Sequence, residues 1–249
     1  MFLLLFTMGV LAGAQNALAG GGSFLLLPTL MLAGMDARAA NITGTVALWP
    51  GQISTGVAGR HLARGMGGLG LGALSLISLC GGGVGAVLLL ITPGAVFAKL
   101  VPFLVLAATV IFAWGSFIRR PVQPGDTGAA VGGGRIVAVQ CAIATYGGYF
   151  GGGIGILMLA AFTLAGLAVR EAGATKNVLN AVLNTTAVAI FATSPQVHWA
   201  EASVVSIGAI LGGQIGTRVL SRINDRPLKI GIVAVGVALS AGLFWRALS

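Results

Sequence analysis

A triplet of glycines interrupts the first apolar stretch of the chain, and this break limits the possible folds more than any other feature. Gly20, Gly21 and Gly22 lie inside a run that is otherwise almost entirely apolar from Phe2 to Leu32. Glycine disfavours a helix interior by roughly 1 kcal/mol relative to alanine, so the triplet predicts a backbone break. In a bilayer, exposed peptide groups cannot face hydrocarbon, and such a break must be buried in protein or line a wet cavity.

Composition places the chain in a membrane. It has 249 residues, of which 57% are hydrophobic and 8% charged, with a mean hydropathy of +0.99. A soluble domain carries about 25% charged residues, and several apolar runs here reach the roughly 20 residues that span a bilayer. The sequence therefore predicts an all-α polytopic membrane protein in the inner (plasma) membrane, with the lipid bilayer as its surroundings.

The glycine triplet occurs twice. Gly151, Gly152 and Gly153 repeat the first triplet inside another apolar run, at a shift of 131 residues. Further matches at shifts of 131 or 132 are Leu32 with Leu164, Arg38 with Arg170, Ala40 with Ala172, Thr43 with Thr175, Gly81, Gly82 and Gly85 with Gly212, Gly213 and Gly216, and Trp114 with Trp245. Composition alone would not align arginine, threonine and tryptophan in register, so the chain is interpreted as an internal duplication.

Charge decides how the two halves are oriented. If each triplet lay within one continuous spanning helix, the 14 basic residues would divide 8 to 6 between the two sides, without bias. If each triplet is the tip of a hairpin, 11 of the 14 share one side: Arg60, Arg64, Arg119, Arg120, Arg135, Arg170, Lys176, Arg218, Arg222, Arg226 and Lys229. Only Arg38, Lys99 and Arg246 lie on the other side. This asymmetry fits the positive-inside rule, and it makes the two repeats inverted.

The expected architecture follows from the hairpin interpretation. Residues 1–118 form the first membrane repeat, residues 119–134 a cytoplasmic linker rich in proline, glycine and charge, and residues 135–249 the second repeat. Each repeat is a glycine-tipped hairpin plus three transmembrane helices, and both termini face outward. The expected hairpin arms are about 20–26 Å long at roughly 1.5 Å per residue, which leaves open whether the hairpins are re-entrant or fully spanning.

The glycine triplets are the candidate site. A triplet followed by a helix presents unpaired backbone N–H groups at a helix N-terminus, which attracts anions without a cationic side chain. The competing interpretation is that glycine allows close helix crossing. Two tips in inverted register favour an anion site near the midplane, whereas the glycines at 81–85 and 212–216 lie inside continuous helices and are interpreted as packing contacts.

Polar residues gather next to the tips. Asn177, Asn180 and Asn184 share one helical face, and either hydrogen-bond between helices or line a polar path. Lys176 is interpreted either as an interfacial lysine that reaches water or as an anion contact at the cytoplasmic mouth, and Arg38 and Arg170 as anchors or capping cations. The residues predicted to bind substrate are Gln15, Asn16, Gly20, Gly21, Gly22, Ser23, Thr43, Tyr146, Tyr149, Gly151, Gly152, Gly153, Lys176, Asn177 and Asn180.

Several function classes are disfavoured by what the chain carries. Its five acids, Asp36, Asp126, Glu171, Glu201 and Asp225, all fall at expected helix ends or loops, which argues against a metal-cation path or a buried carboxylate proton relay. Cys80 and Cys141 lie in apolar, small-residue stretches and are interpreted as packing residues. We expect no metal, no cofactor, no nucleic-acid partner and no enzymatic activity.

The chain resembles a known family in several stretches. It reads GAQNALAGGGSFLLLP over residues 13–28, ANIT over residues 40–43 and GGQIGTR over residues 212–218. These stretches are similar to the sulfite exporter TauE/SafE family, which is related to toluenesulfonate uptake permeases. The chain departs from the family's pattern at Ala19 and at the position equivalent to Pro28, which holds no proline in the second half. The resemblance implies transport of small oxyanions or sulfonates and fixes neither substrate nor direction.

These observations predict a secondary transporter, an exporter of small sulfur-containing or organic anions such as sulfite or sulfonates. Export suits an anion because the negative interior of a cell favours its exit, by roughly 2.3 kcal/mol per charge per 100 mV. A passive anion channel and a non-transporting membrane scaffold or assembly protein stay open as alternatives. A homo-oligomer is also left open.

Overall fold

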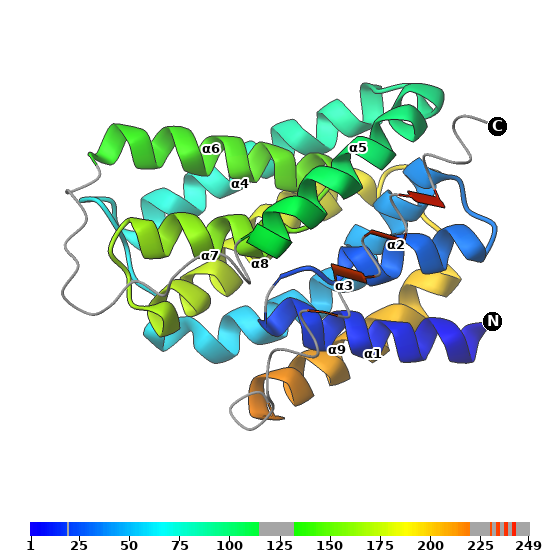
Figure 1. The fold of residues 1–249 in the computed structure, drawn as a ribbon, viewed down its shortest axis with the longest axis horizontal. Helices are drawn as coiled ribbons and strands as arrows, with labels where there is room; N and C mark the ends of the chain where they lie inside the picture. The colour runs from blue at the N-terminus through cyan, green and yellow to red at the C-terminus, as the bar shows by residue number, and fades with distance from the viewer. Residues whose placement is uncertain are drawn as a thin grey trace.

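The chain folds as a bundle of α-helices in the computed structural model, which describes residues 1–18, 20–114 and 132–219 and scattered residues between 230 and 242. The helices are α1 (Phe2–Leu18), α2 (Ser23–Leu32), α3 (Ala37–Gly59), the short 3-10 helix η1 (Arg60–Leu62), α4 (Leu71–Ile91), α5 (Gly94–Ala113), α6 (Gly133–Tyr149), α7 (Ile154–Leu164), α8 (Val169–Phe191) and α9 (Trp199–Val219) (Figure 1). The described part of the chain contains no strand, so the all-α prediction is confirmed there.

Each glycine triplet joins two helices. The first triplet lies between α1 and α2, and the second between α6 and α7, as expected. The second arms are shorter than expected, since α2 has 10 residues and α7 has 11. At roughly 1.5 Å per residue they reach about 15–17 Å, about half of the roughly 30 Å hydrocarbon core, so neither arm could cross a bilayer alone.

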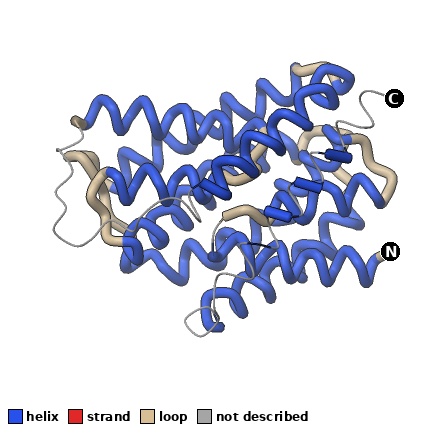
Figure 2. The backbone as a smooth tube through the Cα atoms, viewed as in Figure 1, coloured by secondary structure: helices blue, strands red, loops and turns tan. Residues whose placement is uncertain are grey.

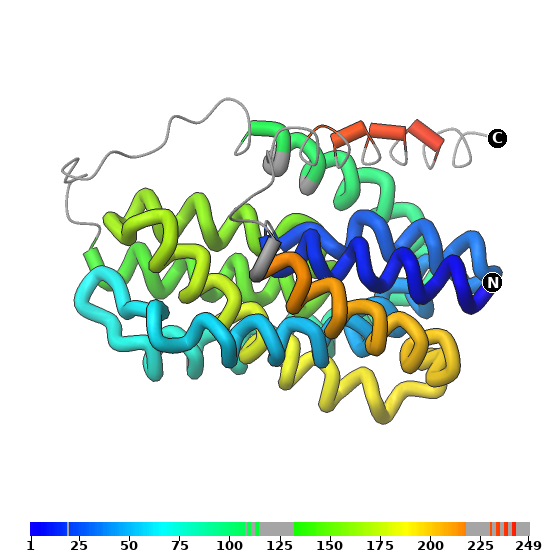
Figure 3. The backbone as a smooth tube through the Cα atoms, turned by 90° about the horizontal axis from the view of Figure 1, so that it is seen from below, coloured from blue at the N-terminus to red at the C-terminus, as the bar shows by residue number. Residues whose placement is uncertain are grey.

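The fourth helices of the two halves exchange partners. Helix α4 packs on α6 and α8 from the second half, and α9 packs on α1 and α3 from the first, while α3 and α8 pack on each other. Figure 3 shows α9, in orange, lying along α1, in dark blue. Glycines permit these contacts: a Cβ at Gly82 would overlap the carbonyl of Leu183, and one at Gly216 would stand 2.9 Å from the carbonyl oxygen of Ala14. The prediction that these glycines serve packing is confirmed.

Equivalent helices start at opposite ends of the bundle. In Figure 1, α1 begins beside the N-terminus at the right and runs to the left, whereas α6 begins at the left and runs to the right. Most loops gather at the two ends of the bundle, and Figure 2 shows the loop segments of the glycine triplets between those ends. The two triplets therefore lie inside the bundle.

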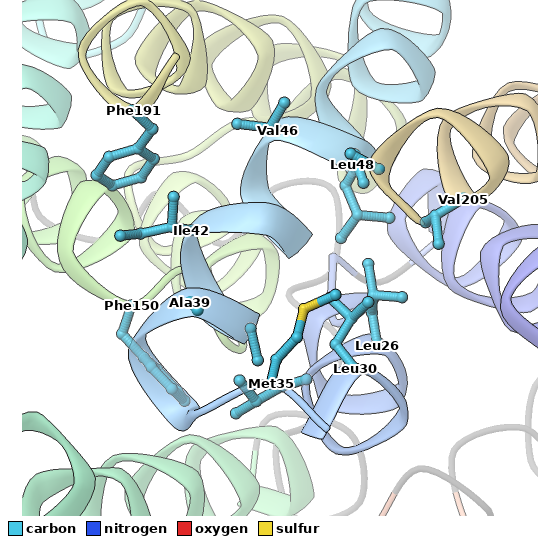
Figure 4. Close-up of a cluster of buried hydrophobic side chains, with 14 of the residues drawn as sticks. Leu26, Leu30, Met35, Ala39, Ile42, Val46, Leu48, Phe150, Phe191 and Val205 are labelled. Carbon is cyan, nitrogen blue, oxygen red and sulfur yellow. The ribbon is translucent and has the colours of Figure 1, made fainter. Parts of the chain in front are cut away.

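The larger buried apolar cluster is built mainly from α2 and α3, and residues of α1, α4, α5, α8 and α9 complete it together with Phe150 and Ile156. Figure 4 shows Phe150, which follows α6, beside Ala39 and Ile42 of α3, with Leu26 and Leu30 of α2 on the other side of the cluster. The bundle thus buries apolar side chains of both halves against one another.

The outer surface is apolar in many places. Exposed large apolar side chains on α4, α5 and α9 include Leu76, Val84, Ile91, Val96, Phe103, Val110, Ile207 and Ile215. Among the described helices, α4 is the one whose length and hydropathy together are sufficient to cross a membrane. Helices α3 and α8 have 23 residues each, and their buried polar side chains lower their hydropathy.

Some expectations fall on residues that the structure does not describe. These are most of the 119–134 linker, Ala19, Trp245, the third helix expected for the second half, and Arg119, Arg120, Arg222, Arg226, Lys229 and Arg246; of Arg218 only the backbone is described.

Candidate functional site

The glycine triplets adopt backbone conformations that glycine permits and other residues resist. Gly20 has a φ of 77°, and Gly153, the residue before α7, has a φ of 74°. In this left-handed region a side chain would be costly. Each triplet therefore turns the chain sharply, so that a second helix can begin inside the bundle.

Each triplet lies against the first turn of the other half's second arm. The N–H of Gly155, in the first turn of α7, donates to the carbonyl oxygen of Gly20 at 3.3 Å, and a Cβ at Gly20 would overlap the backbone of Gly155. A Cβ at Gly151 would stand 3.9 Å from the hydroxyl oxygen of Ser23, the first residue of α2. The two hairpin turns therefore lie side by side.

The residues before the first triplet line it. The side-chain oxygen of Asn16 accepts a hydrogen bond of 2.8 Å from the N–H of Gly22. The amide of Gln15 is 1% exposed, and neither its oxygen nor its nitrogen has a hydrogen-bond partner. A Cβ at Gly21 would stand 2.7 Å from Gln15 Nε2, so this unpaired amide lies against the turn. Buried amides are nearly always paired, so this one requires an explanation.

The equivalent position in the second half is Tyr146, and its hydroxyl has a hydrogen-bond partner. Its hydroxyl donates to the carbonyl oxygen of Gly152 at 2.7 Å. Gln15 and Tyr146 thus both reach the middle glycine of their own triplet. The N–H groups of Gly152, Gly153 and Ile154 donate to no residue that the structure describes, so the start of α7 offers unpaired donors.

The carbonyl ends of α1 and α6 are each capped from the opposite half. Lys176 of α8 donates from Nζ to the carbonyl oxygens of Asn16 at 3.2 Å and of Leu18 at 3.5 Å. Asn41 of α3 donates from Nδ2 to the carbonyl oxygen of Tyr149 at 3.1 Å. Leu18 and Tyr149 are the last residues of α1 and α6. One cap is charged and the other is neutral.

The surroundings of Lys176 contradict one of its two interpretations. The residue is 1% exposed, so it is not an interfacial lysine that reaches water. Its Nζ lies at the carbonyl end of α1, beside the first triplet, and its role as an anion contact stays a prediction.

These residues together form a polar site within an apolar chain. Nearly the whole sequence matches one family. A model of the sulfite exporter TauE/SafE family matches residues 5–243. The chain belongs to the TauE/SafE family. This assignment confirms the resemblance seen in the glycine-rich stretches.

Relatives of this TauE/SafE chain carry names that describe membrane transporters. It is 29% identical over 248 residues to the probable membrane transporter protein YfcA of Escherichia coli, covering 97% of this chain and 89% of that protein. It is 30% identical over 247 residues to the probable membrane transporter protein ORF9 of Sinorhizobium, covering 98% and 92%. A probable membrane transporter protein of Haemophilus influenzae is 25% identical over 246 residues. No solved structure matches the chain.

The family places the chain in a membrane and makes it a transporter by class. The exposed apolar side chains of α4, α5 and α9 fit contact with lipid. The family and its relatives are membrane transporters rather than enzymes.

Other expected site residues of this TauE/SafE chain have structural contacts elsewhere. Thr43 accepts from the N–H of His198 at 3.2 Å and donates to the carbonyl of Gln196 at 3.4 Å. Its counterpart Thr175 binds the backbone N–H and carbonyl of Arg64 at 2.9 and 3.1 Å. Each threonine thus ties down the loop that follows the partner helix, and Thr43 faces away from the triplets.

Tyr149 also departs from its expected place. Its ring packs edge-on against Phe97 at 5.7 Å, and its hydroxyl lies 3.5 Å from the hydroxyl of Thr92 at the end of α4. The ring therefore belongs to the contact with α4 and α5, and only the carbonyl of Tyr149 lies at the site. Arg38 donates to the carbonyl of Thr92 at 2.6 Å, so it is a capping cation, as one interpretation held.

The amides of α8 form an interhelical network. Asn184 donates to Gln52 Oε1 of α3 at 2.8 Å and lies 3.4 Å from Asn180 Oδ1. The bond to Gln52 supports the interpretation of interhelical hydrogen bonding for Asn184, whereas the contact of Asn180 with Asn184 lies within α8. Asn177 is half-buried and its side chain makes no hydrogen bond to a described residue, so its role stays a prediction.

Sequence reasoning missed the role of Asn41. The sequence does not assign it to the site, because no pattern in the chain joins it to Tyr149. The internal repeat gives no signal either, since the counterpart of Asn41 is Gly173 and the counterpart of Lys176 is Gly44.

Proposed function

We propose that this chain is a secondary transporter that exports small sulfur-containing or organic anions, such as sulfite or sulfonates. The observation that carries the proposal is the contact between the first glycine triplet and the first turn of α7 inside the bundle, with the unpaired amide of Gln15 and the side-chain nitrogen of Lys176 beside it. Transporter folds with broken helices often bind substrate where such breaks meet.

Charge supports an anion as the substrate. The unpaired N–H groups at the start of α7 and the buried ammonium of Lys176 both favour negative charge. The described acids, Asp36, Glu171 and Glu201, lie at the starts of α3, α8 and α9. None of them contacts a glycine triplet by a hydrogen bond or ion pair. The printed description of the family, a sulfite exporter, suggests the sulfur oxyanions.

The proposed substrate site is narrower than the sequence predicts. It comprises Gln15, Asn16, Gly20, Gly21, Gly22, Ser23, Tyr146, Gly151, Gly152, Gly153, Lys176 and, at its edge, Asn177. Thr43 and Tyr149 are left out because their side chains contact the loop before α9 and Phe97 of α5. Asn180 is left out because its side-chain oxygen accepts from Asn184 on the same helix.

We further propose that the two halves are inverted repeats, with the linker in the cytoplasm and both termini outside the inner membrane. Support comes from the opposite directions of α1 and α6 and from the matching exchange of α4 and α9. The uneven distribution of lysine and arginine supports the orientation. The short second arms support re-entrant hairpins rather than spanning ones.

Flux measurements test the proposal. The purified chain is reconstituted in liposomes loaded with labelled sulfite or methanesulfonate, and efflux is followed with and without an imposed membrane potential. Saturable efflux that speeds up when the interior is negative is expected, and countertransport distinguishes a carrier from a passive channel. No flux of any sulfur oxyanion would contradict the proposal, and unsaturable flux would favour the channel.

Cysteine labelling tests the orientation separately. Cys80 and Cys141 are both exposed, so they are first replaced by serine. Single cysteines are then introduced at the exposed Ala95 and Thr193 and at Gln123 in intact cells. We expect an impermeant reagent to reach positions 95 and 193 from outside and position 123 only after lysis. The reverse pattern would overturn the proposed orientation.

A further inference from the structure

A single buried lysine lies at the proposed site. Lys176 is 1% exposed, and its Nζ donates only to the carbonyl oxygens of Asn16 and Leu18. Among the described acids, Glu171 lies 3.7 Å from Arg64 and Glu201 lies 3.9 Å from His198. The third, Asp36, caps the start of α3. The described part of the chain therefore offers no carboxylate to balance the ammonium.

The two halves differ in charge at equivalent positions. The carbonyl end of α6 is capped by the neutral amide of Asn41, and Gly44, the counterpart of Lys176, has no side chain. The positive charge is thus confined to the first glycine triplet. A site with twofold pseudosymmetry in its backbone is asymmetric in its electrostatics.

The unpaired amide of Gln15 points to a ligand at the same place. Gln15 precedes Asn16, whose carbonyl accepts from Lys176, and its side chain lies against Gly21. Its amide is 1% exposed and has a donor and an acceptor without partners. A buried polar group of this kind is costly unless something pairs with it. An oxyanion beside the triplet would accept from Gln15 Nε2.

Resting on the proposed function, we infer that this site selects ligands with a single negative charge and binds their anionic group beside the first glycine triplet, with Lys176 and Gln15 as its partners. A neutral ligand leaves the ammonium unbalanced. A dianion leaves one negative charge unbalanced in the same dry interior. Isolated charges in protein interiors are costly. A monoanion is therefore favoured, because its binding leaves no charge unbalanced.

Three tetrahedral sulfur compounds of similar size test the inference. Dimethyl sulfone is neutral, methanesulfonate carries one negative charge and sulfate carries two. Their affinities for the purified full-length chain in detergent are measured by calorimetry at one pH and at constant ionic strength. We expect methanesulfonate to bind about tenfold or more tightly than either of the other two.

Substitution of Lys176 supplies the second arm of the test. K176M keeps the length of the side chain and removes its charge. Methanesulfonate affinity should fall about tenfold or more in K176M, whereas dimethyl sulfone should bind as well as before or better. K176R keeps the charge and should keep the order of the three ligands. K99M is the matched control, because Lys99 is exposed on α5.

The outcomes separate this inference from the proposed function. If sulfate binds the unsubstituted chain as tightly as methanesulfonate, or if K176M leaves the order of the ligands unchanged, the inference is wrong while transport can still stand. If none of the three ligands binds and no sulfur oxyanion is transported, the proposed function itself fails. If K176M does not fold, the order of ligand affinities measured with the unsubstituted chain and with K176R still tests the inference.

Discussion

The N–H of Gly155 donates to the carbonyl oxygen of Gly20 across 3.3 Å, and this bond joins the first glycine triplet to the first turn of α7 in the other half. Neither half can move relative to the other without changing the contact. Transporters of this general plan work by movement of one repeat against the other around a fixed site. The Gly20–Gly155 contact is where such a movement would act on a bound ligand.

Alanine at Gly20 should separate the triplets. The added Cβ would overlap the backbone of Gly155, and the left-handed backbone at Gly20 resists a side chain. We expect G20A to lose about 2 kcal/mol or more of stability in thermal unfolding and to lose anion flux. G34A is the matched control, since Gly34 has a φ of 98° and open space around it. If G34A loses as much stability as G20A, the contact between triplets contributes nothing.

Replacing Gln15 should raise the stability of the chain and weaken its binding of anions. Q15M removes an amide that is buried without a partner and keeps its shape. We expect it to stabilise the chain by about 1–3 kcal/mol and to weaken methanesulfonate binding about tenfold. Such a gain in stability with a loss of activity is common at functional sites.

The control for Q15M is Q140M. The amide of Gln140 also has an unpaired oxygen, but its nitrogen donates to the hydroxyl of Ser78 at 2.8 Å. Its replacement removes one unpaired atom together with one hydrogen bond, so stability should change less and binding should be unaffected. A destabilised Q15M with normal binding would show that Gln15 is part of the packing only.

The neutral cap of α6 is tested by N41L. Leucine leaves the carbonyl of Tyr149 without the bond from Asn41, which should cost about 1–3 kcal/mol in denaturant unfolding. Flux should fall, while the preference for a monoanion should persist because Lys176 is untouched. N177L is the control, since Asn177 is half-buried and its side chain bonds to no described residue. Equal losses in the two variants would argue against a capping role.

The close packing of α4 against helices of the other half depends on its glycines. A Cβ at Gly82 would overlap the backbone carbonyl of Leu183 on α8, so G82A should lose about 2 kcal/mol or more as measured by thermal unfolding. G72A lies on the same helix with open space around it and should gain up to about 1 kcal/mol from helix propensity. A stable G82A would show that α4 and α8 are not packed as closely as described.

Much of the architecture could be predicted because hydrophobic stretches and glycine breaks are local. Each glycine triplet was expected at the tip of a hairpin, and each does separate two helices, α1 from α2 and α6 from α7. The lengths of the second arms were predicted less well, since α2 has 10 residues and α7 has 11.

The roles of individual polar side chains could not be predicted in the same way. Thr43 and Tyr149 belong by spacing to the neighbourhood of the triplets, yet one holds the loop before α9 and the other packs on Phe97. Lys176 looked like an interfacial lysine because it lies one turn into its helix. Helix periodicity says which residues share a face, but it does not say which element covers that face.

The sequence by itself determined the membrane class, the positions of the two backbone breaks and the family, since all of these depend on composition and on order along the chain. Only the tertiary structure decided that Lys176 of α8 reaches the carbonyl end of α1, that Asn41 of α3 caps α6, and that Gln15 is left without a partner. These relationships depend on how α3 and α8 cross in space. That crossing is set by packing among residues that lie far apart in the sequence.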